Sequence, residues 1–90
     1  MKLTAFILSS CPYCLQAGEL IEELYAERPA LSKIEIDYID EADETDLTER
    51  YDYYRVPSFF FGEEKLYEAD PKWSRDEAKR RLSEMFDKLV

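Results

Sequence analysis

The chain has 90 residues, the size of one small domain, so we expect a single domain over residues 1–90. Hydrophobic residues make up 46% of it, which argues against disorder, and 12 basic against 21 acidic residues give a net charge of −9. This charge disfavours nucleic acid and anionic membrane surfaces as partners. No signal peptide or membrane-spanning stretch is visible, so we expect a cytoplasmic protein, and we expect it to be a monomer.

The first part of the chain predicts a strand, a helix and a second strand. The apolar run Lys2–Leu8 has the length of a strand buried on both faces. Apolar residues then recur with helical spacing, so we expect a helix over about Pro12–Arg28, which Gly18 weakens slightly. Strict alternation predicts the next strand over Lys33–Asp40.

A second helix is expected over about Ala42–Tyr54. Its early acidic residues suit the positive end of a helix dipole, and we expect the acidic run Asp40–Asp46 to form a solvated face. The residues that share one face of this helix, and that we expect to point inward, are Leu47, Tyr51 and Tyr54.

The last part of the chain predicts a hairpin and a helix. Strands are expected over Ser58–Phe61 and Lys65–Glu68, with the three phenylalanines of the first strand in the core on alternate faces. Ser74 and Glu77 have the spacing of a capping box, so a helix should begin there. The apolar stripe of this helix comprises Ala78, Leu82, Met85, Phe86 and Leu89.

The resulting order is βαβαββα, which defines an α/β fold. Strands separated by helices imply a parallel pair with right-handed crossovers, and the hairpin adds antiparallel strands. We therefore expect a four-stranded mixed sheet with helices on both faces.

Both cysteines of the chain, Cys11 and Cys14, stand in the motif CPYC between the first strand and the first helix. A sulfur just ahead of a helix faces unpaired backbone N–H groups and the positive end of the helix dipole, and both favour a thiolate. Cys14 lies one turn further along and can reach Cys11 to close a disulfide. We therefore expect Cys11 to be the nucleophile and Cys14 to be the resolving thiol.

Other interpretations of the CxxC pair are a metal site and a pair of inert thiols. A structural zinc ion needs about four ligands, but the chain has two cysteines and no histidine, so we expect no such site. A two-coordinate soft-metal module, for example for Cu(I), stays an alternative. A further alternative is a non-catalytic binding domain whose acidic helix recruits a partner.

The CPYC motif after a first strand, the Val56-Pro57 pair before a hairpin, and the βαβαββα order resemble a dithiol glutaredoxin of the thioredoxin superfamily over nearly the whole chain. The resemblance implies a thioredoxin-like fold and an enzyme, a thiol–disulfide oxidoreductase acting on disulfides of protein or small-molecule substrates. It implies a cis bond at Val56-Pro57, with Pro57 against the cysteines and the Val56 backbone pairing with the substrate. No cofactor is expected to be tightly bound; electrons would come from glutathione or from a thioredoxin-reductase-type flavoenzyme.

The sequence departs from the family where glutathione would bind. Counted without gaps from Pro57, the family's two glycines fall on Tyr67 and Glu68, whose side chains would crowd the peptide and add a negative charge. We therefore expect weak use of glutathione, and an increase in that use when both residues are replaced by glycine.

Three further residues are candidates for substrate binding. Asp70 matches the acidic position of the family's motif, although it could instead cap the turn at Pro71. Arg55 offers one cation beside the cysteines, and Tyr13 offers an aromatic face. The alternatives are that Arg55 is a solvated surface residue and that Tyr13 only packs on the loop.

Overall fold

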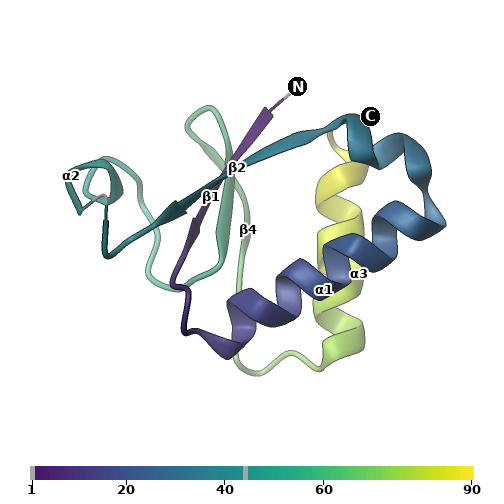
Figure 1. Ribbon diagram of the computed structural model, residues 1–90, viewed down its shortest axis with the longest axis horizontal. Helices are drawn as coiled ribbons and strands as arrows, with labels where there is room; N and C mark the ends of the chain where they lie inside the picture. The colour runs from purple at the N-terminus through teal and green to yellow at the C-terminus, as the bar shows by residue number, and fades with distance from the viewer. Residues whose placement is uncertain (1, 44) are drawn as a thin grey trace.

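The computed structural model describes residues 2–43 and 45–90, and its elements follow the predicted order (Figure 1). The expected strand and helix boundaries are confirmed to within a few residues, except in the second helix. The elements are β1 (Lys2–Ile7), α1 (Pro12–Glu27), the 3-10 helix η1 (Pro29–Lys33), β2 (Glu35–Asp40), α2 (Thr45–Thr48), β3 (Ser58–Phe61), β4 (Glu64–Glu68) and α3 (Arg75–Asp87).

The four strands form one mixed sheet, as predicted, and their order in it is β2-β1-β3-β4. Strands β1 and β2 are parallel, with Leu3 opposite Ile36, and α1 forms the connection between them. Strand β3 runs antiparallel to both β1 and β4. The hairpin turns at Gly62, which has a φ of 62° that glycine adopts without steric cost.

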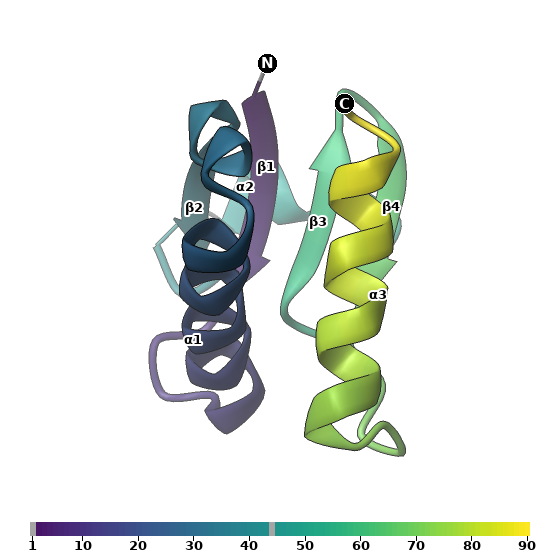
Figure 2. The same ribbon diagram turned by 90° about the vertical axis from the view of Figure 1, so that its right-hand side faces the viewer.

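The larger core lies between the sheet and two helices, α1 and α3, which cover the same face side by side (Figures 1 and 2). Four apolar residues of α1 are buried there, and so are Ala78, Leu82, Met85 and Phe86 of the predicted α3 stripe. Leu89, beyond the end of α3, is partly buried against the same core. The Ser74 hydroxyl accepts a hydrogen bond from the Glu77 amide at 3.1 Å, so the predicted cap of α3 is confirmed.

Ion pairs hold α1 and α3 together at the surface. Glu23 accepts hydrogen bonds from Arg75 and Lys79, and Glu27 lies 2.6 Å from Lys79. Arg28, the C-cap residue that directly follows Glu27, reaches α3 in the same way, through Asp87 and Ser83. Such exposed pairs add little stability one by one, but they fix which side of α1 faces α3.

The other face of the sheet is covered by an aromatic loop, and the predicted helix over Ala42–Tyr54 is wrong in length. Helix α2 has four residues and lies across the sheet from α1 and α3 (Figure 1). Beyond it the chain is irregular, and the Tyr53 ring stacks on Phe6 with centroids 4.9 Å apart. The Tyr51 ring packs 4.8 Å from both Phe6 and Phe60.

Two of the inward-facing assignments need correction. Tyr54 was expected on the inner face of the second helix, but it is 87% exposed. Phe59 and Phe60 are buried on opposite faces as expected, whereas Phe61 is 44% exposed at the end of β3. The side chain of Leu47 lies outside the described part of the structure.

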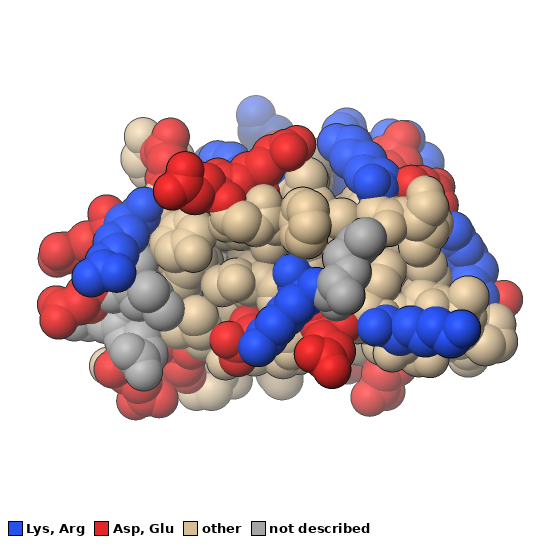
Figure 3. Space-filling view, turned by 90° about the horizontal axis from the view of Figure 1, so that it is seen from above, with Lys and Arg blue, Asp and Glu red and all other residues tan. Residues whose placement is uncertain are grey.

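The surface carries both signs of charge. Seen from above, acidic and basic side chains are interspersed around uncharged residues (Figure 3). Across the described chain, none of the helices combines the length and the apolar character that crossing a membrane requires.

Candidate active site

The cysteines stand where the sequence places them, at the junction of β1 and α1. Cys11 is the N-cap residue of α1, with extended backbone (φ −81°, ψ 123°), and Pro12 is the first helical residue. The amide of Cys14 donates to the Cys11 carbonyl at 3.1 Å, so the two residues are one helical turn apart. Both thiols are free and half-buried.

The Asp40 carboxylate forms a hydrogen bond with the loop that carries the cysteines. The amide of Ser9 donates to one oxygen of Asp40 at 3.3 Å, and the amide of Ala42 donates to the other at 2.9 Å. Asp40 therefore joins the loop after β1 to the turn after β2. It does more than contribute to the solvated acidic face that the sequence predicts.

The two thiols have different surroundings. Burial raises the pKa of the Cys14 thiol to about 12; a hydrogen bond from the Leu8 amide, 3.5 Å from the sulfur, opposes this rise, while the neighbouring Cys11 and the negative charge of Glu41 add to it. The Cys14 thiol is therefore protonated at neutral pH. The raised pKa makes Cys14 a poor first nucleophile.

The Val56-Pro57 turn lies against the cysteine loop. Its peptide bond is cis, as the resemblance implies, and Pro57 is buried. The Cys11 thiol lies 3.9 Å from the Val56 carbonyl oxygen, to which it can donate. A segment far along the chain is thus brought to the sulfur by the pairing of β3 with β1.

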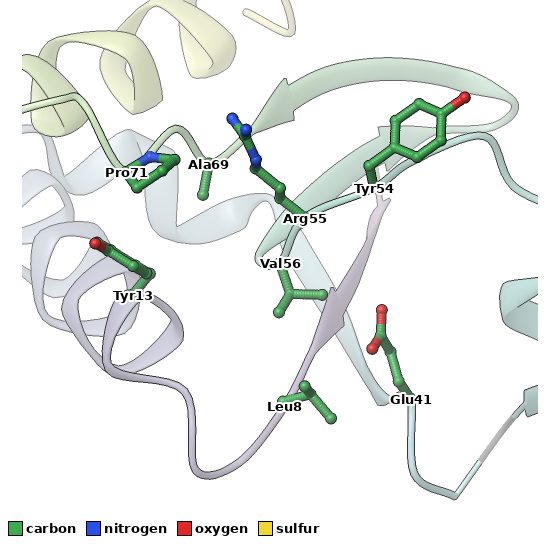
Figure 4. Close-up of a pocket in the computed structure, with 8 residues that line it drawn as sticks. All are labelled: Leu8, Tyr13, Glu41, Tyr54, Arg55, Val56, Ala69 and Pro71. Carbon is green, nitrogen blue, oxygen red and sulfur yellow. The ribbon is translucent and has the colours of Figure 1, made fainter.

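A pocket of about 370 Å³ opens beside this turn (Figure 4). Three of the predicted site residues line it: Tyr13, Arg55 and Val56. Tyr13 is 43% exposed and lies with Pro71 at one end, while Glu41 lies toward the other end. The complete lining comprises Leu8, Tyr13, Glu41, Tyr54, Arg55, Val56, Ala69 and Pro71.

Asp70 lies beside the pocket but serves the turn that follows β4. Its carboxylate accepts a hydrogen bond from the Lys72 amide at 2.9 Å, and its carbonyl accepts one from Trp73 at 3.0 Å. The same carboxylate forms an ion pair with Arg55 at 3.8 Å. Asp70 therefore caps the turn that leads to α3, whose own N-cap is Ser74, and its carboxylate is also the ion-pair partner of Arg55.

The side chains of Tyr67 and Glu68 do not crowd the pocket, contrary to the expectation from ungapped counting. Tyr67 is 7% exposed and packs against Phe59 and Trp73 in the core. Glu68 turns toward the chain before Val56-Pro57 and hydrogen-bonds to its backbone. The small side chain of Ala69 forms the pocket wall at this point.

The sequence analysis did not predict several of the residues that line the pocket. Two of them, Leu8 and Glu41, could have been found from their positions in the sequence. Each directly follows a strand, β1 or β2, and these two strands are predicted to be parallel neighbours. Carboxyl ends of parallel strands meet at one edge of a sheet, where ligands commonly bind. The Glu41 amide donates to the Ile7 carbonyl at 3.0 Å, which holds the two strand ends together.

The described residues offer little for a larger metal site. Within residues 2–43 and 45–90, no group of three or more histidine, cysteine, aspartate or glutamate side chains is placed to hold a metal ion. The expectation that the chain lacks a four-ligand zinc site rests on its composition, as before.

Comparison with solved structures gives three matching chains. No family model matches the chain, and no curated protein matches it. A solved structure described as "Structure of a malarial protein" is similar, with a TM-score of 0.59 and 13% sequence identity, over 93% of this chain and 94% of that one. At this identity the likeness concerns the fold alone: an α/β arrangement around a mixed four-stranded sheet.

Proposed function

We propose that the protein is a thiol–disulfide oxidoreductase with a glutaredoxin-type, thioredoxin-like fold, which reduces disulfides through Cys11 and Cys14. The observation that carries the proposal is the unequal placement of the two thiols. Cys11 caps the start of a helix beside the Val56 carbonyl, and Cys14 lies one turn further along as a half-buried, protonated thiol. The order of the elements supports the fold assignment.

The reaction would proceed in two exchanges. In the first, the Cys11 thiolate attacks one sulfur of the substrate disulfide, a Cys11–substrate disulfide forms, and the other substrate sulfur leaves as a thiolate. In the second, Cys14 attacks the Cys11 sulfur of that mixed disulfide, a Cys11–Cys14 disulfide forms, and the remaining substrate sulfur leaves. The proton of Cys14 passes to the departing sulfur, and two electrons move from the protein to the substrate.

The rise in the pKa of Cys14 suits this sequence. Burial is the largest cause, and the neighbouring Cys11 adds to it while that sulfur is free. In the mixed disulfide the Cys11 sulfur is bonded to the substrate, so the part of the rise that comes from Cys11 is removed. We therefore expect Cys14 to stay protonated during the first exchange and to lose its proton more easily during the second.

The pocket beside Cys11 would hold the substrate, with the Val56 backbone available for strand-like pairing. Arg55 is the single cation among the described lining residues, and Asp70 partly neutralises it. Glutathione carries two carboxylates, so we propose that it is a poor reductant and that a thioredoxin-reductase-type flavoenzyme serves better. We place this activity in the cytoplasm, where a disulfide of this kind is transient.

The test uses single cysteine variants of the full chain with insulin as the disulfide substrate. Cys11→Ser should be inactive, whereas Cys14→Ser should accumulate a mixed disulfide with insulin that is visible by mass spectrometry. A Cys11→Ser protein that still reduces insulin would refute the proposal. The donor is identified by reducing the oxidised protein with glutathione and its reductase or with thioredoxin reductase, and the second route should be faster.

A further inference from the structure

A second hollow, of about 590 Å³, lies between α1 and the edge strand β2. It lies on the side of α1 away from Glu23 and Glu27, which face α3. We call it the α1–β2 groove. Its lining residues are Cys14, Leu15, Gly18, Glu19, Ile21, Glu22, Tyr25 and Tyr38.

Two large apolar side chains of the groove are in contact with water. Leu15 is 61% exposed and Tyr38 is 48% exposed. They come from different elements, α1 and β2, so the exposure is a property of the folded surface rather than of one loop. Adjacent exposed apolar side chains rimmed by charge are typical of interaction surfaces.

Gly18 leaves space in the groove, and the structure does not require glycine at this position. A β-carbon built at this position would meet nothing within 4 Å, and among the described residues only Gly62 has a positive φ. Glycine inside a helix destabilises it relative to alanine, and neither close packing nor backbone conformation requires glycine here. Its effect is to leave an open space between Leu15 and Tyr38.

The charge of the groove is acidic and unpaired. Glu19 and Glu22 are exposed in its lining, and neither forms an ion pair within the part of the chain that the structure describes. No lysine or arginine is among the lining residues. Their neighbours Glu23 and Glu27 are both paired with α3, and Glu19, one turn before Glu23, also interacts electrostatically with Arg75. Glu22 is the acid of α1 that belongs to the groove without any such link to α3.

We propose that the α1–β2 groove docks a short basic segment of a partner protein. An apolar side chain of the segment would lie over Gly18, and its lysines or arginines would face Glu19 and Glu22. Cys14 is among the lining residues of this groove, whereas neither cysteine is among those of the pocket beside Val56, and a docked segment leaves that pocket open. The groove shares Cys14 with the proposed redox site, but the docking is argued from Leu15, Tyr38, Glu19 and Glu22, which have no role in that site, and the binding test needs no redox activity.

The test titrates the reduced, isotope-labelled chain with a blocked peptide of four lysines and two leucines, followed by amide NMR shifts. The shifts should concentrate on residues 14–25 and on Tyr38. Gly18→Met, which fills the open space, should weaken binding at least about tenfold and melt no lower than the unmodified chain. Leu15→Ser should weaken binding as well, and it alters only an exposed side chain.

Matched controls separate docking from general charge attraction. Glu19→Gln with Glu22→Gln should weaken binding several-fold, whereas Glu63→Gln with Glu64→Gln removes the same charge from the exposed hairpin turn and should have little effect. A peptide with serine in place of leucine should bind poorly. Equal loss in both glutamine pairs, or unchanged affinity in both Gly18→Met and Leu15→Ser, would overturn the proposal.

Discussion

Glu68 fixes the backbone that precedes the Val56-Pro57 turn, and its removal should loosen one wall of the pocket. One carboxylate oxygen accepts hydrogen bonds from the amides of Tyr54 and Arg55, the latter at 2.8 Å. The other oxygen pairs with the Lys65 ammonium at 2.9 Å. The perturbation that tests this role is Glu68→Ala, with Glu68→Gln as the variant that keeps an acceptor.

The expected loss follows from these contacts. A hydrogen bond to a charged group contributes about 1.5–3 kcal/mol, but Tyr54 and Arg55 are exposed, so water can replace part of each bond. The Lys65 pair is near the surface and adds little. We expect Glu68→Ala to lower the free energy of unfolding by about 2 kcal/mol and Glu68→Gln by about 1 kcal/mol.

The pH dependence has a defined sign. Burial on its own would raise the pKa of Glu68, but hydrogen bonds from Tyr54, Lys65 and Arg55 outweigh it and lower the pKa below its ordinary value. A carboxylate with a lowered pKa in the folded state stabilises the protein above the unfolded pKa, and that contribution is lost as the pH falls through the folded pKa. The difference between wild type and Glu68→Gln should therefore be complete at neutral pH and narrow below about pH 4.

Urea denaturation at neutral pH and at low pH measures these differences, and insulin reduction measures the effect on the pocket. Activity should fall in Glu68→Ala. Ungapped matching to the glutaredoxins leads to the opposite expectation, that a smaller residue here makes room for glutathione. Unfolding within about 0.5 kcal/mol of wild type, or a gain in glutathione-dependent activity, would refute the role assigned to Glu68.

Three other experiments test the structure. At neutral pH, iodoacetamide should alkylate Cys11 well before Cys14, because burial raises the pKa of Cys14 to about 12; equal rates by peptide mass spectrometry would contradict this. Arg55→Ala breaks an exposed 3.8 Å ion pair, so it should change the free energy of unfolding by less than about 0.5 kcal/mol while raising KM for insulin; an unchanged KM would remove Arg55 from the site. Ser74→Ala removes the cap of α3 and should cost about 1 kcal/mol in urea denaturation, whereas Ser74→Asp, which keeps an acceptor, should cost less.

The elements that could be predicted are those whose local signals agree with their packing. Pro12 and the apolar repeat after it mark α1, and the Ser74–Glu77 cap marks α3. The prediction of a long helix after β2 was wrong because Tyr51 and Tyr54 have helical spacing although they do not lie in a helix. The contacts instead come from Tyr51 and Tyr53, two residues apart, which lie against Phe6 and the sheet as an extended chain would allow.

In the candidate site, too, some features could be predicted from the sequence and others could not. The roles of the two cysteines follow from a local feature, the start of a helix, so the sequence indicates them directly. The uses of Asp40 and Glu68 depend on which distant backbone amides the fold brings within reach, and no spacing along the chain indicates that. Counting residues from Pro57 also cannot reveal the irregular register between Phe59 and Phe60, which shifts the β3–β4 pairing by one residue.

The central place of β1 in the sheet has a consequence for synthesis of the chain. This strand is made before the other three, yet its partners are β2 on one side and β3 on the other. Until the ribosome has released β3, one edge of β1 stays open and the buried face of Phe6 has no cover from Phe60. A nascent or truncated chain that stops short of the hairpin therefore exposes an apolar, unpaired strand, the kind of surface that chaperones bind and that otherwise aggregates.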